Sequence, residues 1–155
     1  MKVRRFRESD FQNLLILAEA MHMEAPSFQW LEMDKEKLMS WGRASIDRPD
    51  EVCGLVAVNG DFLIEGFFLG ICGEYYFGHQ KIASDLALFV SKNSRGGKAA
   101  IMLIKAFRQW AYEQDCEECC LGTTTGIADE KVAKFYERLG FRKAGFILKL
   151  KKGEL

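Results

Sequence analysis

A strand-like run that passes through a glycine turn into an amphipathic helix is the strongest constraint on the fold of this chain. Asp85–Val90 is rich in strand-forming residues, and Gly96 and Gly97 follow after a short polar segment. From Lys98 the apolar residues recur at helical spacing, and this helix is expected to end near Gln114. A strand that feeds a helix in this way predicts an α/β architecture, in which helices cover one sheet.

Hydrophobic periodicity predicts the remaining elements on both sides of this segment. Before it we expect, in chain order, a strand over Val3–Phe6, a helix from Phe11 to about His22, a second helix from Asp34 to before Pro49, and strands over Val52–Val58 and Phe62–Phe68. After it we expect a strand over Cys119–Thr125, a helix that carries Val132 and Leu139, a stop at Gly140, and a final strand over Phe141–Leu150. Asn59-Gly60 is a strong signal for an antiparallel hairpin. The order is β-α-α-β-β-β-α-β-α-β around one mixed sheet.

Size and charge limit the kinds of function that this chain can have. Its 155 residues predict a single domain over residues 1–155. The 22 Lys and Arg residues balance the 22 Asp and Glu residues, so no general positive field is available to hold nucleic acid. The apolar runs are far shorter than the roughly 20 residues of a membrane-spanning helix, and no signal peptide follows the basic N-terminus. We therefore expect a cytoplasmic protein with no nucleic-acid or membrane partner.

The five cysteines predict reduced thiols. Their number is odd, and no export signal accompanies them, so a disulfide framework is not expected. Cys116 and Cys119 have the spacing of a metal-binding pair, but no second pair follows and His22 and His79 are remote in sequence. We therefore interpret the cysteines as structural thiols and expect no metal.

The glycine turn is a candidate anion site. Main-chain amides at the N-terminus of a helix lack partners within the helix, and Gly96 and Gly97 leave them uncovered, so a phosphate would fit there. A Walker loop would need Gly in place of Lys92 and Ser or Thr in place of Ala99. The alternative is that the two glycines only turn the chain.

Two segments resemble motifs of the GNAT acetyltransferases. The diphosphate loop of that family is a six-residue motif with Gln or Arg in the first position, Gly in the fourth and Gly or Ala in the sixth. Ser94–Ala99 matches it at Gly97 and Ala99 and has Ser in the first position. The family also has a helix with Ala, then Phe-Tyr, then Gly-Phe. The matching residues are Ala133, Phe135, Tyr136, Gly140 and Phe141, while Glu130 stands where Asn is frequent. The resemblance extends over nearly the whole chain.

The resemblance implies a mixed, mostly antiparallel sheet flanked by helices, with acetyl-CoA as the acyl donor and no metal. The implied donor-binding residues are Leu88, Phe89, Val90, Arg95, Gly96, Gly97, Lys98, Ala99, Ala100 and Ala133. The amides of Arg95 through Ala99 would hold the diphosphate, with added charge from the Arg95 and Lys98 side chains. The edge of the strand that ends at Val90 would pair with the pantetheine arm.

Tyr136 matches the tyrosine with which the family protonates the leaving thiolate, although it could also be a packed core residue. Asp85 stands about where some members have a base, and Glu65, Glu74 and His79 are alternatives. Acceptor specificity is expected from the loop His22–Trp30, with contributions from Tyr75 and Tyr76.

Two functions follow from the resemblance. The first is an N-acetyltransferase that acts on a primary amine of a small molecule or a protein. The second is a non-catalytic acyl-CoA-binding module, which the departures at Ser94 and Glu130 would permit. A homodimer is a further expectation, because many family members pair through their C-terminal strands.

Overall fold

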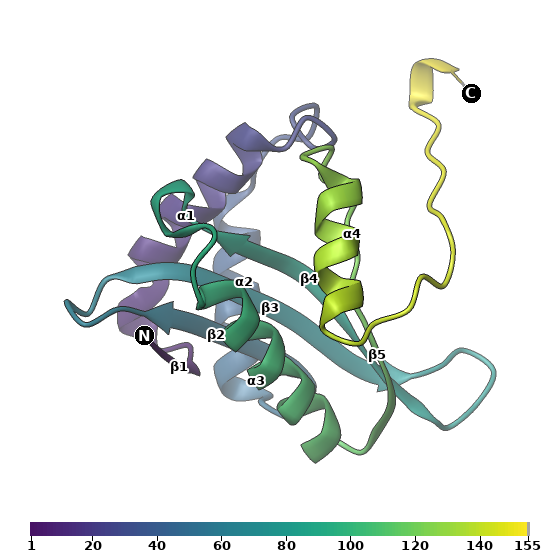
Figure 1. Cartoon of the computed structure of the whole chain (residues 1–155), viewed down its shortest axis with the longest axis horizontal. Coiled ribbons are helices and arrows are strands. Elements are labelled where there is room, and N and C mark those ends of the chain that lie inside the picture. Colours follow the sequence, from purple (N-terminus) through teal and green to yellow (C-terminus); the bar gives the residue numbers. More distant parts are fainter. Residues whose placement is uncertain (155) are drawn as a thin grey trace.

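The computed structural model describes residues 1–154 and contains one five-stranded sheet with the strand order β1-β2-β3-β4-β5 (Figure 1). In chain order the elements are β1 (Lys2–Arg5), α1 (Phe11–Glu24), α2 (Lys35–Asp47), β2 (Val52–Val58), β3 (Ile64–Glu74), β4 (Lys81–Val90), α3 (Ala99–Glu113), β5 (Cys116–Cys120) and α4 (Asp129–Arg138). Short 3-10 turns occupy Glu8–Asp10, Lys92–Ser94 and Lys152–Glu154.

Strand pairing gives a mixed, mostly antiparallel sheet. Neighbouring strands from β1 to β4 are antiparallel, and β4 and β5 are parallel. A parallel pair needs a crossover, and α3 supplies it. The predicted α/β class, the mixed sheet and the element order as far as α4 are confirmed.

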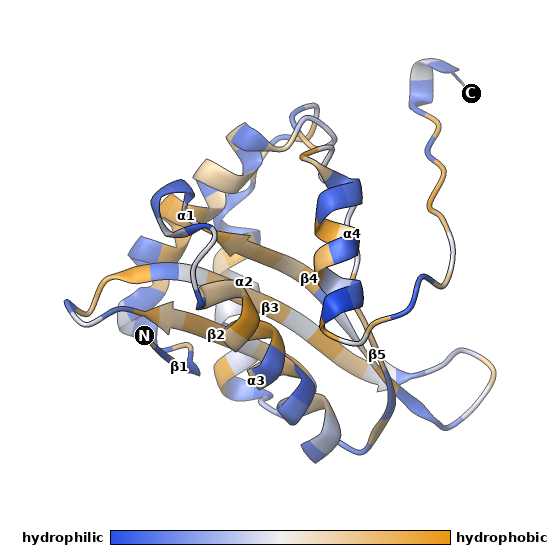
Figure 2. Ribbon diagram, in the orientation of Figure 1, coloured by the Kyte–Doolittle hydropathy of each residue, from blue (hydrophilic) through white to orange (hydrophobic). Residues whose placement is uncertain are grey.

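Two hydrophobic layers hold the helices on opposite faces of the sheet (Figures 1 and 2). On the α3 face the Phe68 ring stacks on Phe107, with 4.2 Å between ring centroids. On the other face Val56, Phe67 and Phe89 belong to a cluster against which α1 and α2 pack. Because both faces are covered, β2 is buried at every position and its sequence is a continuous apolar run.

The antiparallel hairpin of β2 and β3 is confirmed, but its connection is longer than the predicted one, because β3 begins at Ile64 rather than at Phe62. The Asn59 N–H donates to the carbonyl of Leu63 at 3.0 Å, so the loop spans five residues. The left-handed residue is Phe62, with φ of 62°, rather than Asn59 or Gly60. The Asn59 side-chain oxygen also accepts from the amides of Asp61 and Leu63, and these bonds stabilise the longer loop.

The strand predicted over Cys119–Thr125 lies earlier, at Cys116–Cys120. After Cys120 the backbone leaves the sheet because other partners take its polar groups. The Gly122 N–H donates to Asp85 Oδ1 at 2.8 Å, and the Thr123 hydroxyl donates to Asp129 Oδ1 at 2.8 Å. Five of the predicted residues, from Leu121 to Thr125, therefore form a loop that leads to α4.

The final strand predicted over Phe141–Leu150 is wrong. Gly140 ends α4 as predicted, with φ of 94°, but no strand follows it among residues 141–154. This C-terminal segment runs away from the sheet (Figure 1), and Phe146, Ile147 and Leu148 are 81%, 69% and 92% exposed. An alternating pattern needs a neighbouring strand before it forms a sheet, and the edge of β5 is not paired with this segment.

No helix among residues 1–154 combines the length and the apolar character that a bilayer span requires.

Candidate active site

The site begins where β4 and β5 part. The two strands pair only from Lys81 to Ser84 of β4, and the edge from Asp85 to Val90 has no partner on that side. The Asp85 carboxylate lies at the fork, where it accepts the Gly122 N–H at 2.8 Å. A parallel pair that separates in this way leaves main-chain groups of β4 free to bind an extended ligand.

A β-bulge lies beside the fork. Leu69 of β3 pairs with Ala87 and Gly70 pairs with Asp85, so Leu86 is an extra residue without a partner on β3. Bulges re-aim side chains and backbone groups, and they are common next to active sites. The sequence contains no signal that identifies this bulge in advance.

The glycine turn lies at the open end of β4. Gly96 has φ of +80°, a conformation that favours glycine, and a Cβ atom there would meet nothing within 4 Å. A Cβ at Gly97 would meet only the Ser94 carbonyl oxygen, at 3.3 Å. Lys98 makes no side-chain cap to α3. The amides at the start of α3 are therefore neither capped nor covered, and they fit a diphosphate.

The Arg95 side chain does not point into this turn. Its Nε–H donates to the Val90 carbonyl at 3.0 Å, and its Nη2 donates to Glu24 Oε2 at 2.7 Å. The guanidinium also lies 5.4 Å from the centroid of the Phe89 ring. The predicted charge contribution of this side chain to the cradle is thus absent from this structure, whereas Lys98 is exposed beside the turn.

Asp85 lies close enough to Tyr136 to influence the ionisation of the phenol. Tyr136 is 8% exposed on α4, one turn after the half-buried Ala133. Burial and the Asp85 charge raise the pKa of the Tyr136 phenol, so it stays protonated at neutral pH. Burial also raises the pKa of the Asp85 carboxyl, although the hydrogen bond from Gly122 opposes this effect. The structure therefore brings both predicted catalytic residues to the fork.

The other candidate bases lie elsewhere. Glu65 accepts a hydrogen bond from the Asn59 side chain at 3.0 Å, beside the β2–β3 loop. Glu74 lies 3.3 Å from His79 in the hairpin between β3 and β4. Both positions are outside the fork, so among the four candidates only Asp85 lies at the fork.

The α1–α2 loop, which the sequence predicts to contribute to acceptor specificity, contacts the loop between β5 and α4. The Ser27 N–H donates to the Thr125 carbonyl at 3.2 Å, which joins this loop to the loop between β5 and α4. Tyr75 and Tyr76 do not join it: they form an aromatic cluster with Phe77 in the β3–β4 hairpin, with Tyr75–Tyr76 ring centroids 5.1 Å apart.

All five cysteines are free thiols. Cys72 and Cys116 lie with their sulfur atoms 3.0 Å apart, and burial raises the pKa of Cys53 to about 12. The Cys53 thiol therefore stays protonated at neutral pH and is a poor nucleophile. Among residues 1–154 no three His, Cys, Asp or Glu side chains are grouped so that they could hold a metal ion.

Replacement of Asp85 by Asn is expected to stabilise the protein at neutral pH. A partly buried carboxyl whose pKa is raised destabilises the folded state once pH exceeds the unfolded pKa, and the penalty is complete above the folded pKa. Asn keeps an oxygen that can accept the Gly122 N–H and carries no charge. Urea unfolding should show a more stable variant at about pH 7, and the difference should vanish near about pH 3.5. A variant that is less stable at pH 7 would contradict this reading.

Comparison with known proteins adds to this geometry. The family model described as "Acetyltransferase (GNAT) domain" matches residues 49–143. A search of curated proteins finds no match. An acetyltransferase from Trypanosoma brucei superimposes with a TM-score of 0.73 at 20% identity, with 97% of this chain and 98% of that chain covered.

Two further solved structures are similar over their whole length. AAC(6')-Iy, in complex with the bisubstrate analog CoA-S-monomethyl-acetylneamine, gives a TM-score of 0.78 at 17% identity and 97% coverage of both chains. The aminoglycoside antibiotic 6'-N-acetyltransferase AAC(6')-IG from Acinetobacter haemolyticus, an apo structure, gives 0.73 at 15% identity and 98% coverage of both chains. At these identities the likeness concerns the fold.

Proposed function

This chain belongs to the GNAT acetyltransferase family, and we propose that it transfers the acetyl group of acetyl-CoA to a primary amine of a small molecule or a protein. The observation that carries the proposal is the open glycine turn at the end of an unpaired strand edge, with Tyr136 and Asp85 at the fork that this edge forms with β5.

The donor would lie along β4. The amides of Arg95 through Ala99 would hold its diphosphate, and the exposed Lys98 would add positive charge. The unpaired edge at Leu88, Phe89 and Val90 would bind the pantetheine arm. Ala99 is 1% exposed, and this small side chain lets the start of α3 pack closely against the sheet beneath the turn.

Asp85 and Tyr136 would act as the base and the acid of the reaction. Acetyl-CoA would supply a thioester whose C–S bond breaks as the new C–N bond forms. The Asp85 carboxylate would accept the proton of the acceptor ammonium, and its raised pKa makes it a stronger base than an exposed carboxylate. The protonated Tyr136 phenol would donate its proton to the departing sulfur, so that CoA leaves as the thiol. The second proton, which the nitrogen loses as the amide forms, would return to the Tyr136 oxygen and restore the phenol.

Two measurements test the proposal. Native mass spectrometry and calorimetry with acetyl-CoA report donor binding, and thiol release with a panel of primary amines reports turnover. Binding together with amine-dependent thiol release supports the enzyme. Binding without turnover of any amine supports the alternative of a non-catalytic acyl-CoA-binding module, and no binding overturns both.

We also propose that the C-terminal segment pairs with a second copy of the chain. Phe146, Ile147, Leu148 and Leu150 are apolar and exposed, and β5 is the last strand of the sheet within residues 1–154. One molecule thus holds an unpaired strand-like segment and an unpaired strand edge. Exchange of the segment between two molecules would satisfy both at two equivalent interfaces.

Leu148→Asp is expected to convert this dimer to a monomer, because it places a charge in the middle of the segment. The measurement is light scattering coupled to size-exclusion chromatography. Ile16→Asp is the matched control, since Ile16 is 63% exposed on α1 and outside the segment. A wild-type protein that is monomeric at high concentration would contradict the exchange.

A further inference from the structure

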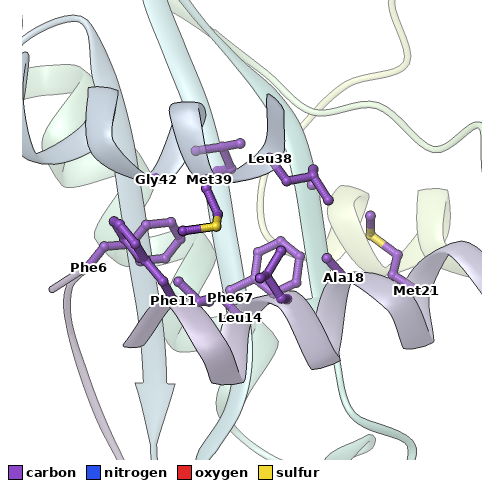
Figure 3. Close-up of a pocket in the computed structure, with 12 residues that line it drawn as sticks. Phe6, Phe11, Leu14, Ala18, Met21, Leu38, Met39, Gly42 and Phe67 are labelled. Carbon is purple, nitrogen blue, oxygen red and sulfur yellow. The ribbon is translucent and has the colours of Figure 1, made fainter. Parts of the chain in front are cut away.

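A cavity lies between the two N-terminal helices and the sheet. Its volume is about 80 Å³, and every residue that lines it is apolar. Ala18 and Met21 of α1 and Leu38 and Met39 of α2 form its outer side (Figure 3). On the sheet side it reaches Ala87 of β4.

The lining decides what the cavity can hold. It offers no polar side chain, so an ammonium or hydroxyl group would lose its hydration there without a hydrogen bond in return. The cavity is partly open, and its apolar lining favours an apolar guest over water. Met21 and Met39 have flexible side chains that can adapt to an apolar guest.

The position of the cavity connects it to the proposed donor site. Ala87 directly follows Leu86, the extra residue of the bulge, and pairs with Leu69, which also lines the cavity. The cavity therefore meets β4 one residue from the bulge, next to the edge along which the donor would lie. The end of that ligand nearest to the cavity is its acyl group.

We propose that this cavity receives the carbon chain of acyl donors longer than acetyl, with three to about five carbons in all. The inference rests on the proposed function. A group of the size of water takes up about 30 Å³, so 80 Å³ holds two or three further methylene groups. The substrate class would then be short-chain acyl-CoA, with acetyl-CoA as its smallest member.

Calorimetry with unreactive thioethers of CoA tests the inference without an acceptor. Each buried methylene contributes about 0.8 kcal/mol, which is about a fourfold gain in affinity. We expect S-butyl-CoA to bind roughly 15-fold more tightly than S-ethyl-CoA for its two extra methylenes. S-octyl-CoA should bind no more tightly than S-butyl-CoA, because the cavity is then full.

Two variants change the cavity in opposite directions. Ala18→Leu fills it and should remove the gain of the butyl over the ethyl thioether, with little effect on S-ethyl-CoA. Leu38→Ala enlarges it and should extend the gain to S-octyl-CoA. Ala20→Leu is the matched control, because it makes the same change on α1 outside the cavity lining. Thermal unfolding confirms that each variant is folded.

The possible failures are distinguishable. Equal affinity for the ethyl and butyl thioethers, or a butyl gain that both variants leave unchanged, overturns the inference and leaves the proposed function standing. If no CoA derivative binds the wild-type protein, the donor site itself is wrong.

Discussion

Gly97→Glu is expected to reduce the affinity for acetyl-CoA by about 10²- to 10⁴-fold. The glycine turn is open, and a Cβ at Gly97 meets only the Ser94 carbonyl oxygen at 3.3 Å, so the variant can fold. Its carboxylate would occupy the anion site and repel the diphosphate. Loss of two hydrogen bonds to a charged group, at about 1.5–3 kcal/mol each, accounts for this range.

Calorimetry with acetyl-CoA measures this effect. Gly73→Glu is the matched control: it adds the same charge at the far end of β3, where a Cβ meets nothing within 4 Å, and it should bind like the wild type. Unchanged affinity in Gly97→Glu would mean that the diphosphate is held elsewhere or that no donor binds.

Tyr136→Phe is expected to lower kcat by about 10²- to 10⁴-fold, the usual contribution of one general acid. The affinity for acetyl-CoA should be preserved, because the change removes one oxygen and leaves the ring that lies beside Phe135 and Phe141. Positioning of the reactants contributes about 7–11 kcal/mol and does not depend on this hydroxyl, so some turnover should remain.

The measurement is steady-state thiol release with an active amine, together with acetyl-CoA calorimetry on the same sample. Tyr112→Phe makes the same chemical change on the outer side of α3, where Tyr112 is 81% exposed, and should leave both values unchanged. Full turnover in Tyr136→Phe would assign Tyr136 to packing and transfer the acid role to another group.

Local pattern was sufficient for much of the fold. Strand β2 matches its predicted range, and α1, α3 and the stop at Gly140 follow from helical spacing and a left-handed glycine. The final strand was predicted from alternation alone and is wrong, because alternation shows that a segment can pair but does not identify its partner. The end of β5 was also misplaced, since it depends on the bond from Gly122 to Asp85, 37 residues earlier.

The candidate site also has one part that short motifs predict and one part that depends on residues far apart in the sequence. The glycine turn and Tyr136 belong to short sequence motifs, so the sequence alone names them as candidate site residues. The Asp85 charge affects the Tyr136 phenol because the fold brings the two residues near each other. That proximity depends on the register in which β4 and β5 pair, and residue spacing in the sequence does not reveal the register. The direction of the Arg95 side chain depends on Glu24, which lies 71 positions earlier.

If the proposed donor binds at the glycine turn, the ion pair between Arg95 and Glu24 would couple that turn to the C-terminal end of α1. Glu24 is the last residue of α1, where a negative charge opposes the helix dipole, and Arg95 and Lys92 compensate for it. An incoming polyanion at the glycine turn competes with Glu24 for these cations. By reciprocity, a cation that neutralises Glu24 strengthens anion binding by the same factor. Donor and acceptor would then favour each other's binding without touching.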